Sequence, residues 1–191
     1  MVMKKEIHVL GIDDAPFDLK DETVLVVATF FRGGEWMDGV LSTMVEVDGE
    51  DATIKVIEMI NKSKFKTQLQ AILLDGIAFG GFNVVNIENI CKHTNIPVIV
   101  VVRRMPDFEK LERALQKLGM KQKYALMEKA GKPQEVTLKQ GKVFIQTAGI
   151  AFEQAEKILH LCCTRSYIPE PIRAAHLIGA GIVKGESKGR A

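Results

Sequence analysis

The chain has 191 residues, of which 47% are hydrophobic and 26% are charged, a balance typical of one globular domain with a full core. Its longest apolar runs have the length of a strand, which excludes a membrane-spanning helix, and no apolar signal segment follows the N-terminus. We therefore expect a cytoplasmic protein that has no membrane partner.

The charges are unevenly distributed, although the net charge is only +2. Residues 2–51 contain twelve acids and four basic residues, whereas residues 116–142 contain seven lysines and two glutamates. The lysine-rich segment predicts either a solvated surface or a surface that follows a phosphate backbone. Tyr124 is its single aromatic residue, so the stacking of unpaired bases on this segment receives little support.

The first half of the chain predicts a meander of three strands. Residues 6–13 and 23–31 are largely apolar, and residues 36–47 return after a glycine-rich turn. The segment DGED at 48–51 ends the third strand and offers a helix cap. Residues 52–61 then follow a helical period.

Strands and helices alternate in the second half. Residues 70–75 and 97–102 have the pattern of buried strands, with a helix expected at 84–93 between them. Pro106 begins a further helix and Gly119 ends it. Beyond it we expect short strands within 122–147, a helix at 150–163, and a last helix that follows the Ile-Pro-Glu-Pro segment and ends near Gly179.

This order of elements predicts a ribonuclease H-like fold. We expect a mixed five-stranded sheet of order 3-2-1-4-5, flanked by helices and carrying an added lysine-rich hairpin. In that order the strand at 70–75 lies beside the strand at 6–13, so Asp13 and Asp75 meet at one edge of the sheet. We expect residues 1–184 to form this single domain and residues 185–191 to form a flexible basic tail.

Three long motifs resemble an uncharacterised, mainly archaeal family, domain of unknown function ninety-nine. They are GIDDAPF at 11–17, LDGIAFGGFN at 74–83 and RSYIPEPIRAAH at 165–176. That family in turn resembles endonuclease V, a magnesium-dependent nuclease that acts near inosine. The second likeness rests on the first, fourth and fifth expected strands and on the Ile-Pro-Glu-Pro block.

The resemblance implies a metal site for Mg²⁺ or Mn²⁺ and a nucleic acid partner. Asp13 and Asp75 match the metal-binding aspartates of endonuclease V, with turn formation as the alternative role for each. Arg103 falls where endonuclease V has a phosphate-contacting lysine. The third carboxylate has no clean match, and Glu46 and Asp48 are the nearest acids. We therefore predict Asp13, Asp75, Glu46 and Asp48 as catalytic residues.

A glycine-rich segment follows Asp75 and leads into a helix. Glycine lets the backbone approach a ligand closely, and the N–H groups of a helix start attract anions. Phe79 and Phe82 are candidates for a base-sized apolar pocket. The predicted nucleic-acid-binding or phosphate-binding residues are Gly76, Phe79, Gly80, Gly81, Asn83, Arg103 and Arg173.

Two functions stay open from the sequence. The strand-end aspartates favour an endonuclease V-like hydrolase that cleaves RNA or DNA with a bound metal. Two endonuclease V histidines are absent, because FGG stands at 79–81 and TAGI at 147–150, and its strand-separating wedge is absent too. These losses favour a non-catalytic protein that binds nucleic acid or nucleotides on the same fold. His176 matches the family motif, where we expect a structural hydrogen bond in preference to catalysis.

Overall fold

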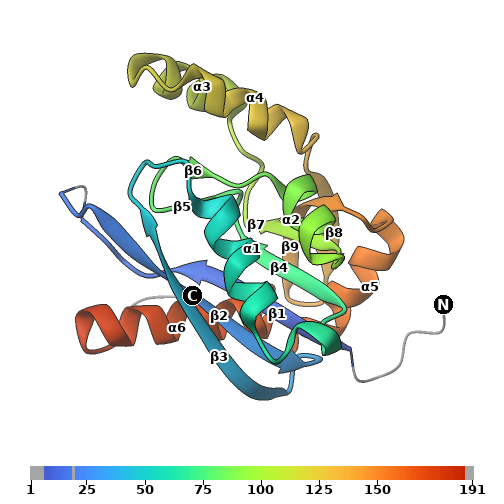
Figure 1. The fold of residues 1–191 in the computed structure, drawn as a ribbon. Helices are drawn as coiled ribbons and strands as arrows, with labels where there is room; N and C mark the ends of the chain where they lie inside the picture. The colour runs from blue at the N-terminus through green and yellow to red at the C-terminus, as the bar shows by residue number, and fades with distance from the viewer. Residues whose placement is uncertain (1–6, 19, 188–191) are drawn as a thin grey trace.

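A seven-stranded mixed sheet forms the centre of the molecule (Figure 1). The structure is a computed structural model that describes residues 7–18 and 20–187, so the last four residues of the expected basic tail lie outside it. The strands follow the order β3-β2-β1-β4-β7-β9-β8. Their bounds are β1 (His8–Asp14), β2 (Thr23–Arg32), β3 (Trp36–Glu46), β4 (Ala71–Asp75), β7 (Val98–Val102), β8 (Gln134–Leu138) and β9 (Gly141–Ala148).

Helices cover both faces of this sheet because its central strands are apolar on both sides. Alternate residues point to opposite faces, so Leu10 and Ile12 of β1 join one core cluster and Val9 joins the other. The first cluster includes residues of α1 (Ala52–Lys62) and α2 (Ile87–Thr94). The second includes residues of α5 (Phe152–Cys162) and α6 (Glu170–Lys184).

Two smaller pieces lie beside these layers. A two-stranded ribbon, β5 (Ala78–Phe79) with β6 (Asn83–Val84), follows the end of β4. A helical hairpin, α3 (Phe108–Lys117) with α4 (Lys121–Lys129), projects beyond that ribbon (Figure 1). It is joined to the body by a separate apolar cluster, in which Leu115 and Met127 pack against Val84 of β6.

The predicted neighbours among the first five strands are confirmed, since β3, β2, β1, β4 and β7 lie in the expected order. The added hairpin, β8 with β9, extends the same sheet, because β9 pairs antiparallel with β7. One expectation was wrong: residues 121–129 form α4 instead of a strand. Their sequence, KQKYALMEK, contains strong helix formers and no β-branched residue, which explains the helix.

Two helix boundaries also differ from expectation. The helix expected at 84–93 begins at Ile87, because Asn86 caps it by accepting a hydrogen bond from the N–H of Asn89 at 3.0 Å. The last helix continues past Gly179 to Lys184 and ends at Gly185. Gly179 serves close packing instead, since a Cβ there would lie 3.1 Å from Ala15.

Helix α6 lies directly against β1 because Gly11 leaves room for it. A Cβ on Gly11 would collide with the main chain of Pro171 at the start of α6. The hydroxyl of Thr29 on β2 donates a hydrogen bond to the carbonyl oxygen of Pro171 at 2.6 Å, which fixes the same end. The helix therefore runs along β1 and carries its later residues to the acidic end of that strand.

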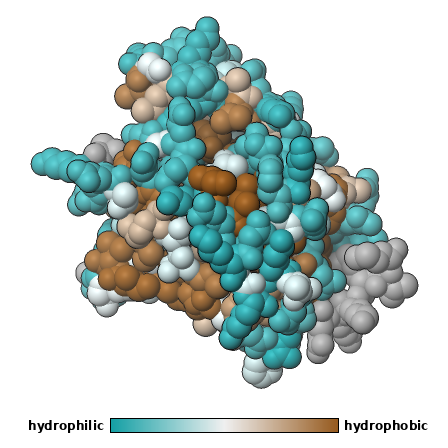
Figure 2. Space-filling model, viewed as in Figure 1, coloured by the Kyte–Doolittle hydropathy of each residue, from teal (hydrophilic) through white to brown (hydrophobic). Residues whose placement is uncertain are grey.

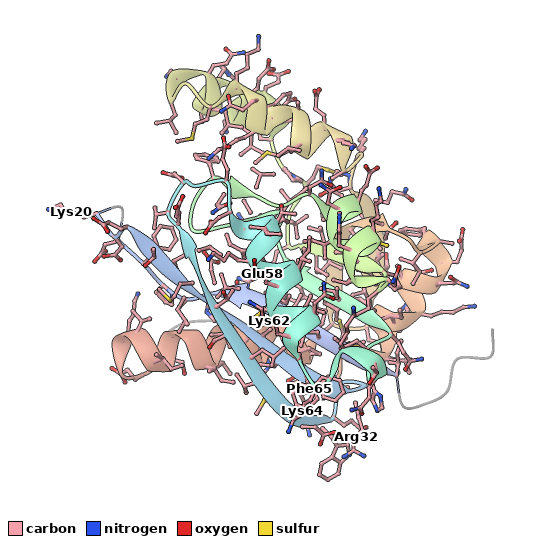
Figure 3. All side chains as sticks on the ribbon, viewed as in Figure 1. Lys20, Arg32, Glu58, Lys62, Lys64 and Phe65 are labelled. Carbon is pink, nitrogen blue, oxygen red and sulfur yellow. The ribbon has the colours of Figure 1, made fainter. Side chains whose placement is uncertain are left out.

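The face seen in Figure 2 is largely hydrophilic, and its largest gathering of apolar atoms lies near α6 and β3. Val40 and Met44 of β3 and Ile182 and Val183 of α6 are among the exposed apolar residues. The outer face of α1 is charged, with Lys62 and Glu58 paired at 3.3 Å (Figure 3). Within the described residues, no helix is both long and apolar enough to cross a lipid bilayer.

Candidate functional site

Carboxylates gather where β1 and β4 end. These strands are parallel neighbours with Ile12 opposite Leu74, so Asp13 and Asp75 follow at the same edge. Asp13 is only 4% exposed, and Asp14 beside it is half-buried. The three aspartates, Asp13, Asp14 and Asp75, are hereafter called the cleft acids.

Asp13 is bonded to the last helix. Its Oδ2 lies 2.9 Å from Nδ1 of His176, and its Oδ1 accepts a hydrogen bond from the N–H of Asp14 at 2.9 Å. Burial raises the pKa of Asp13 to about 7, the bond to His176 opposes this, and the charges of Asp75 and Asp14 add to it. The same bond raises the pKa of His176. The hydrogen bond that we expected His176 to make therefore joins it to Asp13, which is one of the predicted catalytic residues.

Asp14 and Asp75 have different partners. The N–H of Gly80, in the turn between β5 and β6, donates to Oδ2 of Asp14 at 2.7 Å. Asp75 has Nη2 of Arg103 at 3.6 Å, too long for a good hydrogen bond. Burial raises the pKa of both carboxyls. At Asp14 the hydrogen bond from Gly80 opposes this rise, and at Asp75 the positive charge of Arg103 opposes it. The cleft acids thus crowd negative charge into a poorly hydrated place.

A cleft of about 720 Å³ opens above these acids. Gly76 and Arg103 line it on the side of β4 and β7. Its opposite wall comes from far along the chain, from the turn between β8 and β9 and from the loop before α6. The residues that line this wall are Gln140, Gly141, Lys142 and Tyr167, and Arg104, which follows Arg103, lines the rim between the two sides. The cleft thus has an acidic floor and a basic rim with one aromatic side chain.

Four predicted site residues meet in this cleft: Asp13, Asp75, Gly76 and Arg103. Glu46 and Asp48 are not among the described residues that line it. Asp48 adopts a φ of 54°, and its Oδ1 accepts a hydrogen bond from the N–H of Phe82 at 2.7 Å. Glu46 is exposed, and its N–H donates to Asp51 Oδ1 at 3.0 Å. Both acids shape the loop that supports the β5–β6 turn.

The remaining predicted binding residues lie behind the cleft. Phe79 is fully buried in the core, so it presents no face to a ligand. Asn83 is also fully buried, and its Oδ1 accepts from the N–H of Ala52 at the start of α1. Gly81 has a φ of 83°, and a side chain there would collide with Asp48. Gly80 acts through its N–H on Asp14, as described above.

Arg173, predicted to bind phosphate, forms an ion pair instead. Its Nη2 and Nε lie 2.6 and 2.9 Å from Oε2 of Glu170, one turn earlier on α6. This pairing raises the pKa of Arg173. The guanidinium is about two-thirds buried, with a side-chain exposure of 34%. It therefore braces the start of α6 within the Ile-Pro-Glu-Pro block.

Sequence reasoning missed the second wall of the cleft. Lys142 and Gln140 were treated as part of a lysine-rich hairpin, and Tyr167 as part of a family motif without a role. The motif itself was the available signal, since RSYIPEPIRAAH places Tyr167 just before the proline-marked start of a helix. No local pattern shows that this loop meets the β8–β9 turn, which lies in another part of the sequence.

The chemistry of the floor suits a hard divalent cation, because its donors are carboxylate oxygens. Within the described residues, no three His, Cys, Asp or Glu side chains are placed so that they could hold a metal ion by themselves. Mg²⁺ is commonly held by one or two carboxylates with water and substrate phosphate. Asp13 and Asp75 fit that incomplete kind of site. The guanidinium of Arg103, whose side chain is 36% exposed on the same cleft, offers donors for the phosphate.

Comparison with known sequences extends over nearly the whole chain. The sequence model of the endonuclease dU family matches residues 5–183. A UPF0215 protein of Methanothermobacter thermautotrophicus is 50% identical over 192 residues, which cover 99% of this chain and 94% of that protein. A UPF0215 protein of Methanosarcina acetivorans is also 50% identical over 192 residues, covering 99% and 97% of the two chains.

Solved structures show the same architecture. A protein of unknown function from Archaeoglobus fulgidus has a TM-score of 0.84 at 38% identity, covering 93% of this chain and 99% of that one. Endonuclease V of Ciona intestinalis, in complex with a 24-mer DNA containing an inosine followed by a ribo-adenosine, has a TM-score of 0.58 at 18% identity. That match covers 90% of this chain and 83% of the other, and it concerns the fold alone. The two resemblances predicted from the sequence are confirmed.

Proposed function

Because the chain belongs to the endonuclease dU family, we propose that it is a metal-dependent phosphodiester hydrolase that acts on nucleic acid. The observation that carries the proposal is the crowding of three aspartates, one buried and two half-buried, on the floor of a cleft with a basic rim. Such crowding is electrostatically unfavourable unless a cation joins it, so it is typical of functional sites. The ribonuclease H-like description of the sheet is part of this proposal, as is a place in the cytoplasm.

Asp13 and Asp75 are the residues that would hold Mg²⁺ or Mn²⁺. A divalent ion bound there supplies polarisation of the phosphodiester and a lowered pKa of the attacking water. His176 fixes the orientation of Asp13 through the bond at 2.9 Å. We propose Asp14, in place of Glu46 or Asp48, as the third carboxylate, since it shares the floor of the cleft. Its raised pKa suits it to accept a proton from water.

Arg103 would bind the phosphate. Its Nε is buried without a partner, and its Nη2 is 3.6 Å from Asp75, so the guanidinium is not saturated by the protein. A phosphate in the cleft that accepts from the exposed part of the guanidinium would form a charge-assisted hydrogen bond. Negative charge that develops on the phosphate during hydrolysis would then lie beside a fixed cation. This arrangement supports transition-state stabilisation at Arg103.

The substrate class follows from the relatives as part of the proposal. The family model is described as endonuclease dU, and one structural neighbour is endonuclease V of Ciona intestinalis in complex with DNA that contains an inosine. Deoxyuridine and inosine are both products of base deamination. We therefore propose DNA or RNA that contains a deaminated base as the substrate, with cleavage of a nearby phosphodiester.

A nuclease assay tests the proposal directly. Labelled oligonucleotides with one deoxyuridine, one inosine or no modified base are incubated with the protein and Mg²⁺, Mn²⁺ or EDTA. We expect cleavage only with metal, and more of it on the modified strands. Asp75→Asn is the control for a contaminating nuclease, because it removes one carboxylate from the floor while it keeps the side-chain shape.

The alternative, a non-catalytic binding protein on the same fold, is favoured because no three metal ligands converge among the residues that the structure describes. The same assay separates the two functions. Binding of the oligonucleotides without cleavage under any metal condition would replace the hydrolase with the binding protein. Cleavage by the parent protein that Asp75→Asn abolishes would exclude the alternative.

A further inference from the structure

The second wall of the cleft presents an aromatic ring. Tyr167, in the loop before α6, is 37% exposed and lines the same cleft as the aspartates. It lies over the backbone of the β8–β9 turn, since a Cβ on Gly141 would be 3.5 Å from the Tyr167 side chain. One side of the residue is therefore packed on the turn, and the remainder is open to the cleft.

The wall is held in place before any ligand binds. The amide of Gln140 donates to the carbonyl oxygens of Cys163 and Thr164 at 3.5 and 3.4 Å, which ties the turn to the loop. On the other side of Tyr167, the hydroxyl of Ser166 bonds both the N–H and the carbonyl of Ile168, and Ile168 is buried. An aromatic group with fixed neighbours loses little conformational freedom when a ligand stacks on it.

Cations lie on the same rim. Arg104 is exposed and makes no hydrogen bond or ion pair with another described residue. Lys142 lines the cleft beside Tyr167, with its Nζ 3.0 Å from Glu135 and 5.8 Å from the ring centre of Phe144. An aromatic platform beside cations is the combination by which proteins bind an unpaired nucleic acid strand.

We propose that this wall binds an unpaired nucleotide next to the phosphate at the cleft floor, with the base stacked on Tyr167 and the backbone phosphates on Arg104 and Lys142. The proposal rests on the proposed function and specifies its substrate as locally single-stranded. A base within a duplex has its faces covered by neighbouring bases, so it has no free face for Tyr167. Tyr124, the single aromatic residue of the lysine-rich segment, is not among the described residues that line the cleft, and the fold supplies Tyr167 from the loop before α6.

Binding measurements in EDTA test this inference without any cleavage. Fluorescence anisotropy is recorded with labelled oligonucleotides of about twelve nucleotides, within the range of single-strand site sizes, as DNA, as RNA and as the matching duplex. Tyr167→Ala should weaken binding of single strands by about tenfold or more, as expected for the loss of one base–aromatic stack. Tyr167→Phe should bind within about twofold of the parent protein, because the phenyl ring still stacks.

The second tyrosine of the chain supplies a matched control. Tyr124 lies on α4, away from the cleft, so Tyr124→Ala should leave the affinity unchanged. A 2-aminopurine base in the oligonucleotide should be quenched by the parent and by Tyr167→Phe, and not by Tyr167→Ala. Equal melting temperatures for the variants would show that folding is intact, and Tyr167→Phe keeps the test valid if Tyr167→Ala is unstable.

Salt dependence tests the cations. Arg104→Ala should reduce the slope of log affinity against log salt concentration by about 0.7, which corresponds to one phosphate contact on a single strand. Arg113→Ala, on the exposed face of α3 and 3.8 Å from Glu109, should leave the slope as it is. If Arg104→Ala weakens the binding of single strands and leaves the binding of duplex unchanged, the result would support Arg104 as a phosphate-binding residue of the cleft.

The inference fails if Tyr167→Ala binds single strands as tightly as the parent, or if it weakens duplex binding equally. Its failure can be told from that of the proposed function. If single-strand binding depends on Tyr167 but no metal-dependent cleavage is seen, the stacking site at Tyr167 is supported and the proposed hydrolase function is rejected. Cleavage that is unaffected by Tyr167→Ala supports the hydrolase and rejects the wall.

Discussion

Two groups of acids in this protein differ in their surroundings: one group is crowded together, and the other accepts hydrogen bonds from nearby N–H donors. The cleft acids are crowded, and burial raises the pKa of each. The second group, here called the turn acids, consists of Glu46, Asp48 and Asp51 at the end of β3 and before α1. Asp51 Oδ1 accepts from Asn83 Nδ2 at 2.7 Å and from the N–H of Glu46, and Asp48 Oδ1 accepts from the N–H of Phe82.

The difference shows how acids of one type take up different roles. Asp48 satisfies the N–H group of Phe82 in the β5–β6 turn, and Asp51 satisfies that of Glu46, so the removal of either acid should cost stability. The cleft acids face one another in a place with few donors, so their removal should relieve repulsion and cost function instead. The following variants test this contrast, from the largest expected effect to the smallest.

Asp75→Asn should lower metal-dependent kcat/KM by about a thousandfold, because half of the pair that holds the ion is lost. The melting temperature should stay equal or rise, since one buried negative charge is removed. Any Mn²⁺-induced rise in the melting temperature of the parent should disappear. Steady-state cleavage and thermal unfolding with and without Mn²⁺ measure these effects. A sharply lower melting temperature, together with no Mn²⁺ effect on the parent, would make Asp75 a structural turn residue.

Asp13 should make stability fall as the pH rises from about 4 to 7. Its pKa is about 7 in the folded protein and 3.8 as the reference value, so the folded state binds the extra proton in this interval. Stability is then fully present below the lower pKa and is lost as the pH passes the upper one. The effect is on the order of 4 kcal/mol, because the two pKa values differ by about 3 units and each unit corresponds to about 1.4 kcal/mol.

Urea unfolding at a series of pH values measures this dependence. Asp13→Asn should flatten it, because the buried group no longer titrates. Asp38→Asn, an exposed acid on β3 paired with Arg32 at 2.6 Å, is the control and should keep the slope of the parent. An unchanged slope in Asp13→Asn would show that another group carries the pH dependence.

Asp51→Ala should lower the free energy of unfolding by about 2 kcal/mol. It leaves two donors without their acceptor, the N–H of Glu46 and Nδ2 of the buried Asn83. Urea unfolding measures the loss, and Glu50→Ala is the neighbouring control, since Glu50 is exposed and its contact with Gln122 is long at 3.5 Å. Affinity for Mn²⁺ should be retained in Asp51→Ala, and a variant that is stable but has lost the metal would contradict the division into two groups.

Glu46→Gln should have the smallest effect. Its carboxylate makes no hydrogen bond or ion pair with another described residue and does not line the cleft. We expect a change below about 0.5 kcal/mol in the free energy of unfolding, as for ordinary surface substitutions, and nearly unchanged cleavage. A loss of cleavage comparable to that of Asp75→Asn would restore Glu46 as the third carboxylate.

The strand order was predictable because it depends on local patterns. Apolar runs, turns and helix caps are each read within a few residues, and parallel pairing then follows from the order of elements. The positions of Asp13 and Asp75 follow from that order alone. Helix α4 was missed because the segment was treated as part of a hairpin, although its helix formers indicated otherwise.

The roles of the acids and the second wall were not predictable in this way. Glu46 and Asp48 follow a strand just as Asp13 does, and only their hydrogen-bond partners distinguish them. The bond between Asp13 and His176 spans 163 positions of sequence, and it depends on how α6 docks against Gly11. Tyr167 reaches the β8–β9 turn through the same docking. Contacts of this kind are made by tertiary packing, which leaves no periodic signal.

The docking of α6 along β1 also bears on when the site comes into existence. β1 is synthesised well before α6, since Asp13 and its partner His176 are 163 positions apart. Domains generally fold as units during or after synthesis, and contacts between distant segments form late. A nascent chain without α6 lacks both the partner of Asp13 and the second wall of the cleft. Any activity of this cleft towards nucleic acid is therefore withheld until α6 has been synthesised and has docked.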